Sequence, residues 1–203
     1  MKFVTTKLWN DDVRSGNTRE ALKKSLENLG LDYVDLYLIH WPAEGYVEAY
    51  LEMEKLQKEG LTRNIGVSNF RKSHLQNLLS KVHIVPSINQ IETNPQMVDE
   101  ETIQYCKENK IGVEAWSPLG SGACLNNPKI QEIANKYQKP SAQIILRWLL
   151  QKGIVILPKS VHENRIKENI DLFNFVLENE DVELINQLNQ HKRTGPDPDN
   201  FDF

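Results

Sequence analysis

The chain has 203 residues, 39% hydrophobic and 26% charged, which is the composition of a globular chain large enough to bury one core. A net charge of −4 and a pI near 5.8 exclude the broad basic surface that nucleic acid or an anionic membrane requires. No apolar run approaches the ~20 residues of a membrane span, and Cys106 and Cys124 are the only cysteines. We therefore predict one domain over residues 1–203, in the cytoplasm and without a metal site.

Short runs rich in β-forming residues alternate along the chain with longer amphipathic segments. Repeated βα units of this kind predict an α/β fold with parallel strands connected by helices, either a barrel or a doubly wound sheet. The predicted strands are residues 3–6, 34–39, 64–67, 85–89, 112–115 and 154–157. The predicted helices are residues 18–29, 47–59, 72–79, 100–109, 128–137, 140–151 and 163–170.

Residues with polar groups fall at or just after the last residue of every predicted strand. A barrel brings all its C-terminal strand ends around one mouth, whereas an open sheet gathers its ligand at one switch point, so the barrel explains the pattern better. A dinucleotide-binding open sheet would also need G-x-G-x-x-G after its first strand. The nearest candidate, Gly120-Ser121-Gly122, lacks the third glycine and follows the fifth strand. The side chains at the strand ends are Lys7, His40, Ser68, Asn69, Gln90, Trp116, Ser117, Lys159 and Ser160.

The last predicted strand leads into a group of residues suited to phosphate. Leu157-Pro158 is followed by Lys159 and Ser160, and the next predicted helix carries Arg165 and Asn169 on one face. Lysine supplies a point charge, serine a hydroxyl, and arginine a planar fork that matches phosphate oxygens, all near a helix N-terminus. A solvated strand end and a surface helix would show the same residues. The prediction of a phosphate site therefore depends on the other motifs of the chain.

Six motifs, spread over nearly the whole chain, carry a resemblance to a known family. They are Val4-Thr5-Thr6-Lys7-Leu8-Trp9, Leu38-Ile39-His40-Trp41-Pro42, Gly66-Val67-Ser68-Asn69-Phe70, Asn89-Gln90, Trp116-Ser117-Pro118-Leu119-Gly120 and Pro158-Lys159-Ser160. In these motifs the chain resembles the aldo-keto reductases, and its tail after Gly195 resembles that of small bacterial-type members. The resemblance implies a TIM barrel that binds NADP(H) in extended form at its C-terminal mouth.

The resemblance also implies a role for individual positions in holding the cofactor. Ser68, Asn69 and Gln90 would hold the nicotinamide carboxamide, and Trp116 would stack on the ring. Ser117 and Leu119 would line the pyrophosphate, Lys159, Ser160 and Arg165 would hold the 2′-phosphate, and Glu168 and Asn169 would lie near adenine. These roles favour NADPH over NADH.

Purely structural roles compete with some of these assignments. Asn69 could cap the helix that follows Arg71, and Gln90 could be a hydrogen bonder at the barrel rim. Trp9, Trp41 and Trp116 could be packing residues, since tryptophan buries a large area wherever it falls. Their shared placement at strand ends favours a pocket wall instead, and a small pocket of this kind suits modest carbonyl substrates such as keto sugars or small aldehydes.

The reaction that the resemblance implies is reversible reduction of an aldehyde or ketone, with hydride from the nicotinamide and a proton from an acid. Lys7 matches the lysine that tunes the family's tyrosine acid, and His40 matches the histidine that orients the substrate oxygen. The family's tyrosine and aspartate have no match here. Tyr33 and Tyr37 belong to the approach and body of a strand, so we expect neither to replace the acid.

The resemblance covers strands three to eight of an eight-stranded barrel, and 203 residues fall short of the roughly 250 typical of that fold. Three explanations are open: an N-terminally truncated reductase, a catalytically inactive NADP-binding relative, or a chain whose site another polypeptide completes. Without the first two strands, two barrel edges would be exposed, which predicts aggregation or a homo-oligomer.

Overall fold

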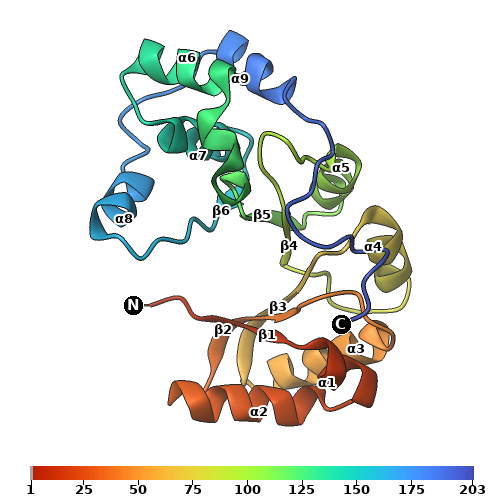
Figure 1. Cartoon of the computed structure of the whole chain (residues 1–203). Helices are drawn as coiled ribbons and strands as arrows, with labels where there is room; N and C mark the ends of the chain where they lie inside the picture. Colours follow the sequence, from red (N-terminus) through yellow and green to blue (C-terminus); the bar gives the residue numbers. More distant parts are fainter. Residues whose placement is uncertain (1) are drawn as a thin grey trace. The chain divides into compact units, whose positions relative to one another are not determined.

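Parallel strands joined by helices make up much of the computed structural model, which describes residues 2–203 (Figure 1). The chain divides into two compact units. The first unit contains residues 2–90, 101–112 and 198–203, and the second contains residues 91–100 and 113–197. The predictions of a single domain, a cytoplasmic location and a homo-oligomer stay predictions.

The first unit is built on four neighbouring strands that run parallel in chain order. They are β1 (Thr5–Leu8), β2 (Val34–Ile39), β3 (Thr62–Ser68) and the first part of β4 (Ile88–Glu92). Helices α1 (Asn10–Ser15), α2 (Thr18–Leu29), α3 (Tyr46–Lys58), α4 (Lys72–Leu79) and most of α5 (Glu100–Glu108) connect or flank these strands.

The second unit begins with the end of β4 and contains two further strands that pair in parallel, β5 (Gly112–Trp116) and β6 (Val155–Ile156). Between them lie a 3₁₀ segment, η1 (Gly120–Asn126), and helices α6 (Pro128–Tyr137) and α7 (Ser141–Gln151). Helices α8 (Glu163–Ile170) and α9 (Asn179–Asn186) follow β6.

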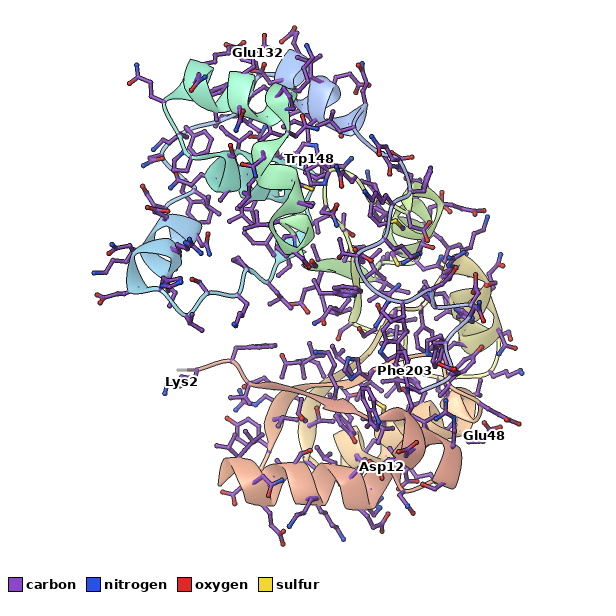
Figure 2. The ribbon with its side chains drawn as sticks, viewed as in Figure 1. Lys2, Asp12, Glu48, Glu132, Trp148 and Phe203 are labelled. Atoms are coloured by element: carbon purple, nitrogen blue, oxygen red, sulfur yellow. The ribbon has the colours of Figure 1, made fainter. Side chains whose placement is uncertain are left out.

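Each unit has its own apolar core. All six residues of β2 are buried, as expected for a parallel strand covered on both faces. Asp35 lies within this strand, and its carboxylate accepts hydrogen bonds from Val4 N (2.9 Å) and Arg63 Nη1 (3.2 Å), so the buried charge is satisfied. In the second unit α7 carries the core, with Trp148 fully buried (Figure 2) and its Nε1 donating to Asn186 Oδ1 at 2.9 Å.

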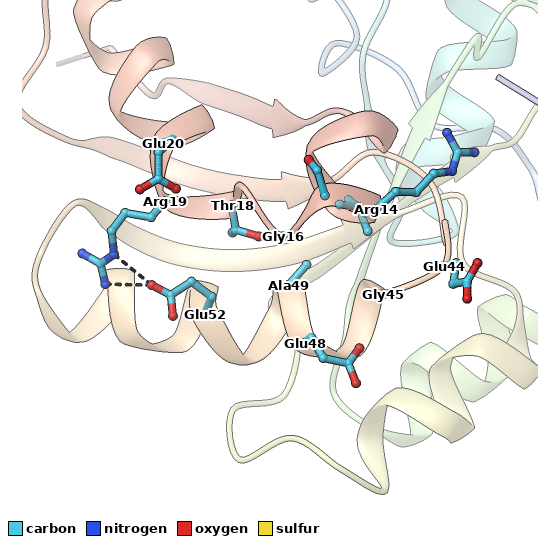
Figure 3. A pocket seen from close by; sticks show the side chains of 12 residues that line it. Arg14, Gly16, Thr18, Arg19, Glu20, Glu44, Gly45, Glu48, Ala49 and Glu52 are labelled. Atoms are coloured by element: carbon cyan, nitrogen blue, oxygen red, sulfur yellow. Dashed lines mark hydrogen bonds and ion pairs between the residues drawn. The ribbon is translucent and has the colours of Figure 1, made fainter.

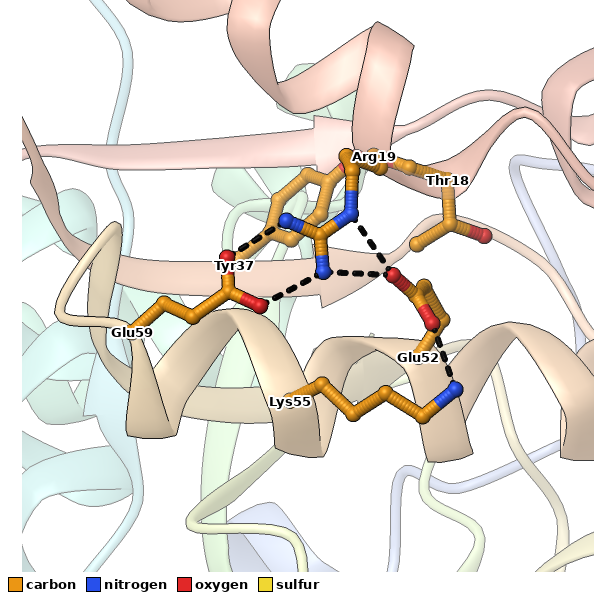
Figure 4. A network of polar contacts seen from close by, with 6 residues as sticks. All are labelled: Thr18, Arg19, Tyr37, Glu52, Lys55 and Glu59. Carbon is orange, nitrogen blue, oxygen red and sulfur yellow. Dashed lines mark hydrogen bonds and ion pairs between the residues drawn. The ribbon is translucent and has the colours of Figure 1, made fainter.

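An ion-pair network joins α2 to α3 on the outside of the first unit (Figure 4). Arg19 Nε donates a hydrogen bond to Glu52 Oε1 at 2.9 Å, and its two Nη atoms donate to the two carboxylate oxygens of Glu59. Lys55 donates to the other oxygen of Glu52 at 2.8 Å. Hydrogen bonding to Glu59, then to Glu52, raises the pKa of Arg19, so the network is charged at all ordinary pH values. It fixes the helices that support β1 and β2.

The periodic helices agree closely with the sequence prediction, and the short elements do not. α2, α4, α6 and α8 have the predicted bounds. β1 begins two residues later than predicted, because Thr5–Leu8 pairs with Leu36–Ile39 and leaves Phe3 68% exposed. The sequence reading missed α1, η1 and α9, whose lengths are six, seven and eight residues. Among residues 2–203, no helix is both long and apolar enough to cross a membrane.

Candidate active site

In the first unit, the predicted polar residues of β2, β3 and β4 form one hydrogen-bonded cluster. Asn69 Nδ2 donates to the main-chain oxygen of His40 (3.0 Å) and to Ser68 Oγ (3.2 Å). Ser68 Oγ and the Asn69 amide nitrogen both donate to the main-chain oxygen of Gln90, each at 2.9 Å. Ser68, Asn69 and Gln90 are all buried. The three residues predicted to bind the nicotinamide carboxamide therefore form a preorganised cluster, which also holds the backbone of His40.

Asn69 adopts a left-handed backbone with φ of 63°, which is uncommon for residues other than glycine. The competing role as a helix cap is wrong, because the cap of α4 is Arg71. Two strand-end assignments also need correction. Lys7 lies inside β1, and Gln90 lies inside β4, which continues to Glu92. Both strands have the predicted length but lie two or three residues further along the chain, because their bounds depend on pairing with the neighbouring strands and not on the local apolar run.

His40 follows β2 directly, and its amide nitrogen donates to the main-chain oxygen of Leu8 at 3.0 Å. Burial, and to a smaller degree the charge of Lys7, lowers the pKa of the His40 imidazole to about 4. The ring is therefore neutral at pH 7, with one nitrogen donating and the other accepting. A neutral imidazole can donate a hydrogen bond to a carbonyl oxygen, but it is a poor source of a proton at this pH.

Aromatic side chains surround His40 in the first unit. The ring of Trp9 meets the imidazole edge-on with centroids 5.0 Å apart, and Trp41 lies at 6.4 Å. The sequence reading missed two further members. Phe201 and Phe203 each lie with their ring centroids 5.3 Å from Trp41, and Phe203 also stacks on Trp9 at 5.9 Å. These two phenylalanines of the tail extend the predicted aromatic wall.

Polar contacts at both ends hold this tail segment in place. The main-chain oxygen of Phe203 accepts from Asn10 Nδ2 and Arg14 Nη2, each at 2.9 Å. Asp199 pairs with Arg71 at 2.7 Å and approaches His74 Nε2 at 3.5 Å. Asn10 and Arg14 belong to α1, the short helix that the sequence reading missed.

In the second unit, the predicted pyrophosphate, 2′-phosphate and adenine residues line one cavity of about 740 Å³. Its wall comes from the turn after β5, from η1, and from the segment that joins β6 to α8. Trp116, which was assigned to the nicotinamide ring, ends β5 and does not line this cavity. The lining includes Ser117, Leu119, Lys159, Ser160, Arg165, Glu168 and Asn169, and also Ser121, Asn126 and Gln131, which the sequence reading did not assign.

The side chains that line this second-unit cavity suit an anion. Lys159 and Arg165 supply positive charge, and the Ser160 hydroxyl accepts from His162 N at 3.1 Å, just before α8 begins. Ser117 has a left-handed φ of 50°, and its Oγ accepts from Ser121 N at 3.1 Å. The turn after β5 is thereby held against η1, and both segments face the same cavity.

A second depression, of about 770 Å³, lies among α1, α2 and α3 of the first unit (Figure 3). None of the predicted site residues lines it. Glu44, Glu48 and Glu52 face it together with Glu20, and Arg19 is already paired with Glu52. The carboxylates would repel a phosphate, so the residues around His40 in the first unit and the cavity of the second unit remain two candidate sites.

Comparison with known proteins identifies the family. The model of the Aldo/keto reductase family matches residues 2–190. The chain belongs to the aldo/keto reductase family. It is 52% identical over 202 residues to the uncharacterized oxidoreductase YtbE of Bacillus subtilis (strain 168), covering 99% of this chain and 72% of the relative. It is 48% identical over 202 residues to the glyoxal reductase of the same strain, covering 99% and 73%.

A solved aldo-keto reductase supports the fold class. The crystal structure of a Bombyx mori aldo-keto reductase in complex with NADP is 40% identical, with a TM-score of 0.91, and the match covers 97% of this chain and 71% of that one. The prediction that this reductase-family chain represents part of a TIM barrel is thus confirmed, and the open-sheet alternative is excluded. The roles of individual site residues in this family member stay predictions.

Proposed function

We propose that this aldo/keto reductase chain binds NADP(H) and that its site serves the reduction of small aldehydes or ketones to alcohols. One observation carries the proposal: residues chosen from two separate motifs of the sequence line a single cavity in the second unit. The motif at residues 117–119 and the motif at residues 159–169 are far apart along the chain, so their shared cavity is independent support for a common ligand. Relatives and a solved NADP complex in the same family agree with it.

The side chains present fit NADP(H). Lys159, Ser160 and Arg165 would hold the 2′-phosphate, because two cations and a hydroxyl donate to phosphate oxygens and a 2′-hydroxyl would leave these donors without a charged partner. Ser117 and Leu119 would line the pyrophosphate, with Glu168 and Asn169 beside adenine. In the first unit, Ser68, Asn69 and Gln90 would bind the carboxamide. The cofactor, when bound, supplies or accepts a hydride.

His40 would orient the substrate oxygen. Its neutral imidazole donates one hydrogen bond and so polarises a carbonyl without carrying a competing charge. Trp9 and Trp41 would form the apolar wall that excludes water, and their ring contacts with His40, at 5.0 and 6.4 Å, support this role. Lys7 would act on the proton donor, since a nearby positive charge favours the ionised form of an acid.

The substrate class that we propose is a small carbonyl compound, including dicarbonyls such as glyoxal. Two features support it: the relative from Bacillus subtilis named glyoxal reductase, and the aromatic wall around His40, which Phe201 and Phe203 extend. Such a wall would pack against a small substrate and leave one polar group, the imidazole, to bind its oxygen.

A second candidate function, NADPH binding without reduction, follows from the tyrosines of the first unit. Tyr37 is fully buried, its hydroxyl donates to Thr18 O at 3.3 Å, and burial raises its pKa. The hydroxyl of Tyr33 accepts a hydrogen bond from Arg63 Nη2 at 2.6 Å. Tyr33 precedes the first residue of β2, whereas His40 follows the last residue of that strand. We therefore expect neither phenol to serve as the proton donor beside His40. Residues 1–203 alone would then bind NADPH but reduce aldehydes negligibly, because general acid catalysis is worth about 10²- to 10⁴-fold.

The cofactor assignment is tested by titrating the 203-residue chain with NADPH and with NADH while recording intrinsic tryptophan fluorescence. We expect NADPH to bind roughly ten- to a hundredfold more tightly, since a charge-assisted contact contributes about 1.5 to 3 kcal/mol. Arg165→Ala should remove most of this preference. Lys167→Ala is the matched control, because Lys167 lies on the same helix but pairs with Glu163 at 2.7 Å and does not line the cavity. Equal affinities for the two cofactors would contradict the assignment.

The two candidate functions separate in a turnover assay with NADPH and glyoxal, followed at the absorbance of the reduced nicotinamide. Tight NADPH binding with negligible turnover supports binding without reduction. Robust turnover by the same 203-residue chain supports reduction and means that a proton donor other than Tyr33 or Tyr37 serves the site. His40→Ala should then lower kcat/KM.

A further inference from the structure

Glu92, at the end of β4, is a buried carboxylate that accepts hydrogen bonds from one short segment of the second unit. The residue is 2% exposed. Its Oε1 accepts from both Thr194 N and Thr194 Oγ1, each at 2.6 Å, and its Oε2 accepts from Gly195 N at 3.3 Å. Burying a charge is costly unless hydrogen bonds compensate it, so these three donors account for its presence there. Glu92 thus ties residues 194–195 to the end of β4.

Gly195 lies directly against the indole of Trp116. A Cβ placed on this glycine would be 2.4 Å from Trp116 Cη2, 3.2 Å from Cζ3 and 3.4 Å from Cζ2. The contact leaves no room for any side chain at residue 195 unless the ring moves. The backbone of Gly195 does not have the left-handed φ that only glycine adopts readily, so the ring contact alone requires glycine here.

The segment that carries Gly195 is fixed at several further points within the second unit. Asn189 exchanges hydrogen bonds with Val98, accepting from its N at 3.1 Å and donating to its O at 3.0 Å. Gln190 N and Lys192 N both donate to Gln96 O, at 3.1 and 3.0 Å. Ser117 Oγ lies 3.4 Å from Thr194 Oγ1. Residues 189–195 therefore form a strap that is anchored at several residues leading up to the Trp116 contact.

We propose that Glu92 is a positioning residue for the cofactor: through the strap at residues 194–195, it holds the indole of Trp116 in the orientation that stacks on the nicotinamide ring. This inference rests on the proposed function, in which Trp116 is the stacking residue. Glu92 itself touches no cofactor atom. A ring held from the side of Gly195 presents a fixed surface, and a preorganised aromatic surface loses little conformational entropy when a ligand stacks on it.

The experiment compares two ligands with the 203-residue chain, by isothermal titration calorimetry. NADPH carries the nicotinamide, whereas adenosine 2′,5′-bisphosphate carries the phosphates and adenine alone. Gly195→Ala displaces the ring, and Glu92→Gln turns an amide nitrogen toward one of the strap's N–H donors. We expect both variants to bind NADPH about two- to tenfold more weakly, the worth of a ring contact, with unchanged affinity for adenosine 2′,5′-bisphosphate.

Gly153→Ala is the matched control in the same unit. Gly153 has a φ of +75° and nothing within 4 Å of an added Cβ, so alanine there strains the backbone without touching Trp116. This variant should lose stability and keep its affinity for both ligands. Unchanged NADPH affinity in Gly195→Ala and Glu92→Gln, or an equal loss for both ligands, would overturn the inference. Failure of the wild-type chain to bind either ligand would instead refute the proposed function.

Discussion

The neutral state of His40 makes the stability of the chain depend on pH in a defined window. The native imidazole has a pKa of about 4, against about 6.5 in the unfolded chain. Between these values the unfolded state binds more protons than the native state, so the free energy of unfolding falls as pH falls from about 6.5 to about 4. Above this window the full stability is present, and below it the His40 contribution no longer changes.

The size of the effect follows from the two pKa values. From these two pKa values, the free energy of unfolding should fall by about 1.8 kcal/mol between pH 7 and pH 5. His40 is only partly buried, and solvent screening reduces this to about 1 kcal/mol. His40→Gln cannot take up a proton, so it should lack this component. Urea unfolding at pH 7 and pH 5 should therefore show a free-energy loss about 1 kcal/mol larger in the wild type than in the variant.

The NMR titration of the His40 imidazole gives the direct measurement. Its signals are identified by their absence in His40→Gln, and they should show a neutral ring down to about pH 5. Lys7→Met should raise the pKa only slightly, because burial is the larger cause and the charge of Lys7 the smaller one. An imidazole that titrates near 6.5, together with equal pH dependence in wild type and His40→Gln, would refute the reasoning.

Three further predictions concern packing and association. Glu54 is buried, and its Oε1 accepts hydrogen bonds from His83 N and Ile84 N, each at 2.7 Å. Glu54→Leu should therefore lower the free energy of unfolding in urea by about 1.5 to 3 kcal/mol. A loss below about 0.5 kcal/mol would show that these contacts do not stabilise the fold. Gly66→Ala should cost about 1 to 3 kcal/mol in the same assay, because a Cβ there would be 2.6 Å from Ile88 O, and an unchanged midpoint would contradict the close approach. Ile170 and Phe173 are 73% and 77% exposed, which favours association through this apolar surface. The apparent molecular mass of the wild type in light scattering should therefore rise with protein concentration, and it should rise less in the double variant Ile170→Lys/Phe173→Lys. A wild-type monomer whose mass does not depend on concentration would exclude association through this surface.

The sequence predicted best those features that depend on local periodicity. α2 has its apolar residues Leu22 and Leu26 four apart and ends at Gly30 with a left-handed φ of 64°, so its bounds are readable without tertiary information. The residues around Lys159 and Arg165 were also predictable, since a strand end and one helix turn place them together. β1 was displaced because its bounds depend on pairing with β2.

The features that the sequence did not reveal depend on contacts between distant segments. Phe201 and Phe203 flank Asp202 in a polar tail, and only their contact with Trp41 shows that they extend the aromatic wall. The tie from Glu92 to Thr194 has the same character, because neither residue belongs to a local motif. α1 has six residues and no apolar periodicity, so it was missed although it supplies Asn10 and Arg14, which hold the tail.

We propose above all that the second-unit cavity holds the phosphates of NADPH. A crystal structure of the 203-residue chain with NADPH is the most direct test. We expect the 2′-phosphate within hydrogen-bond distance of Lys159, Ser160 and Arg165, and the adenine beside Asn169. A cofactor whose 2′-phosphate contacts none of these three residues, for example one bound among α1, α2 and α3, would refute the proposal.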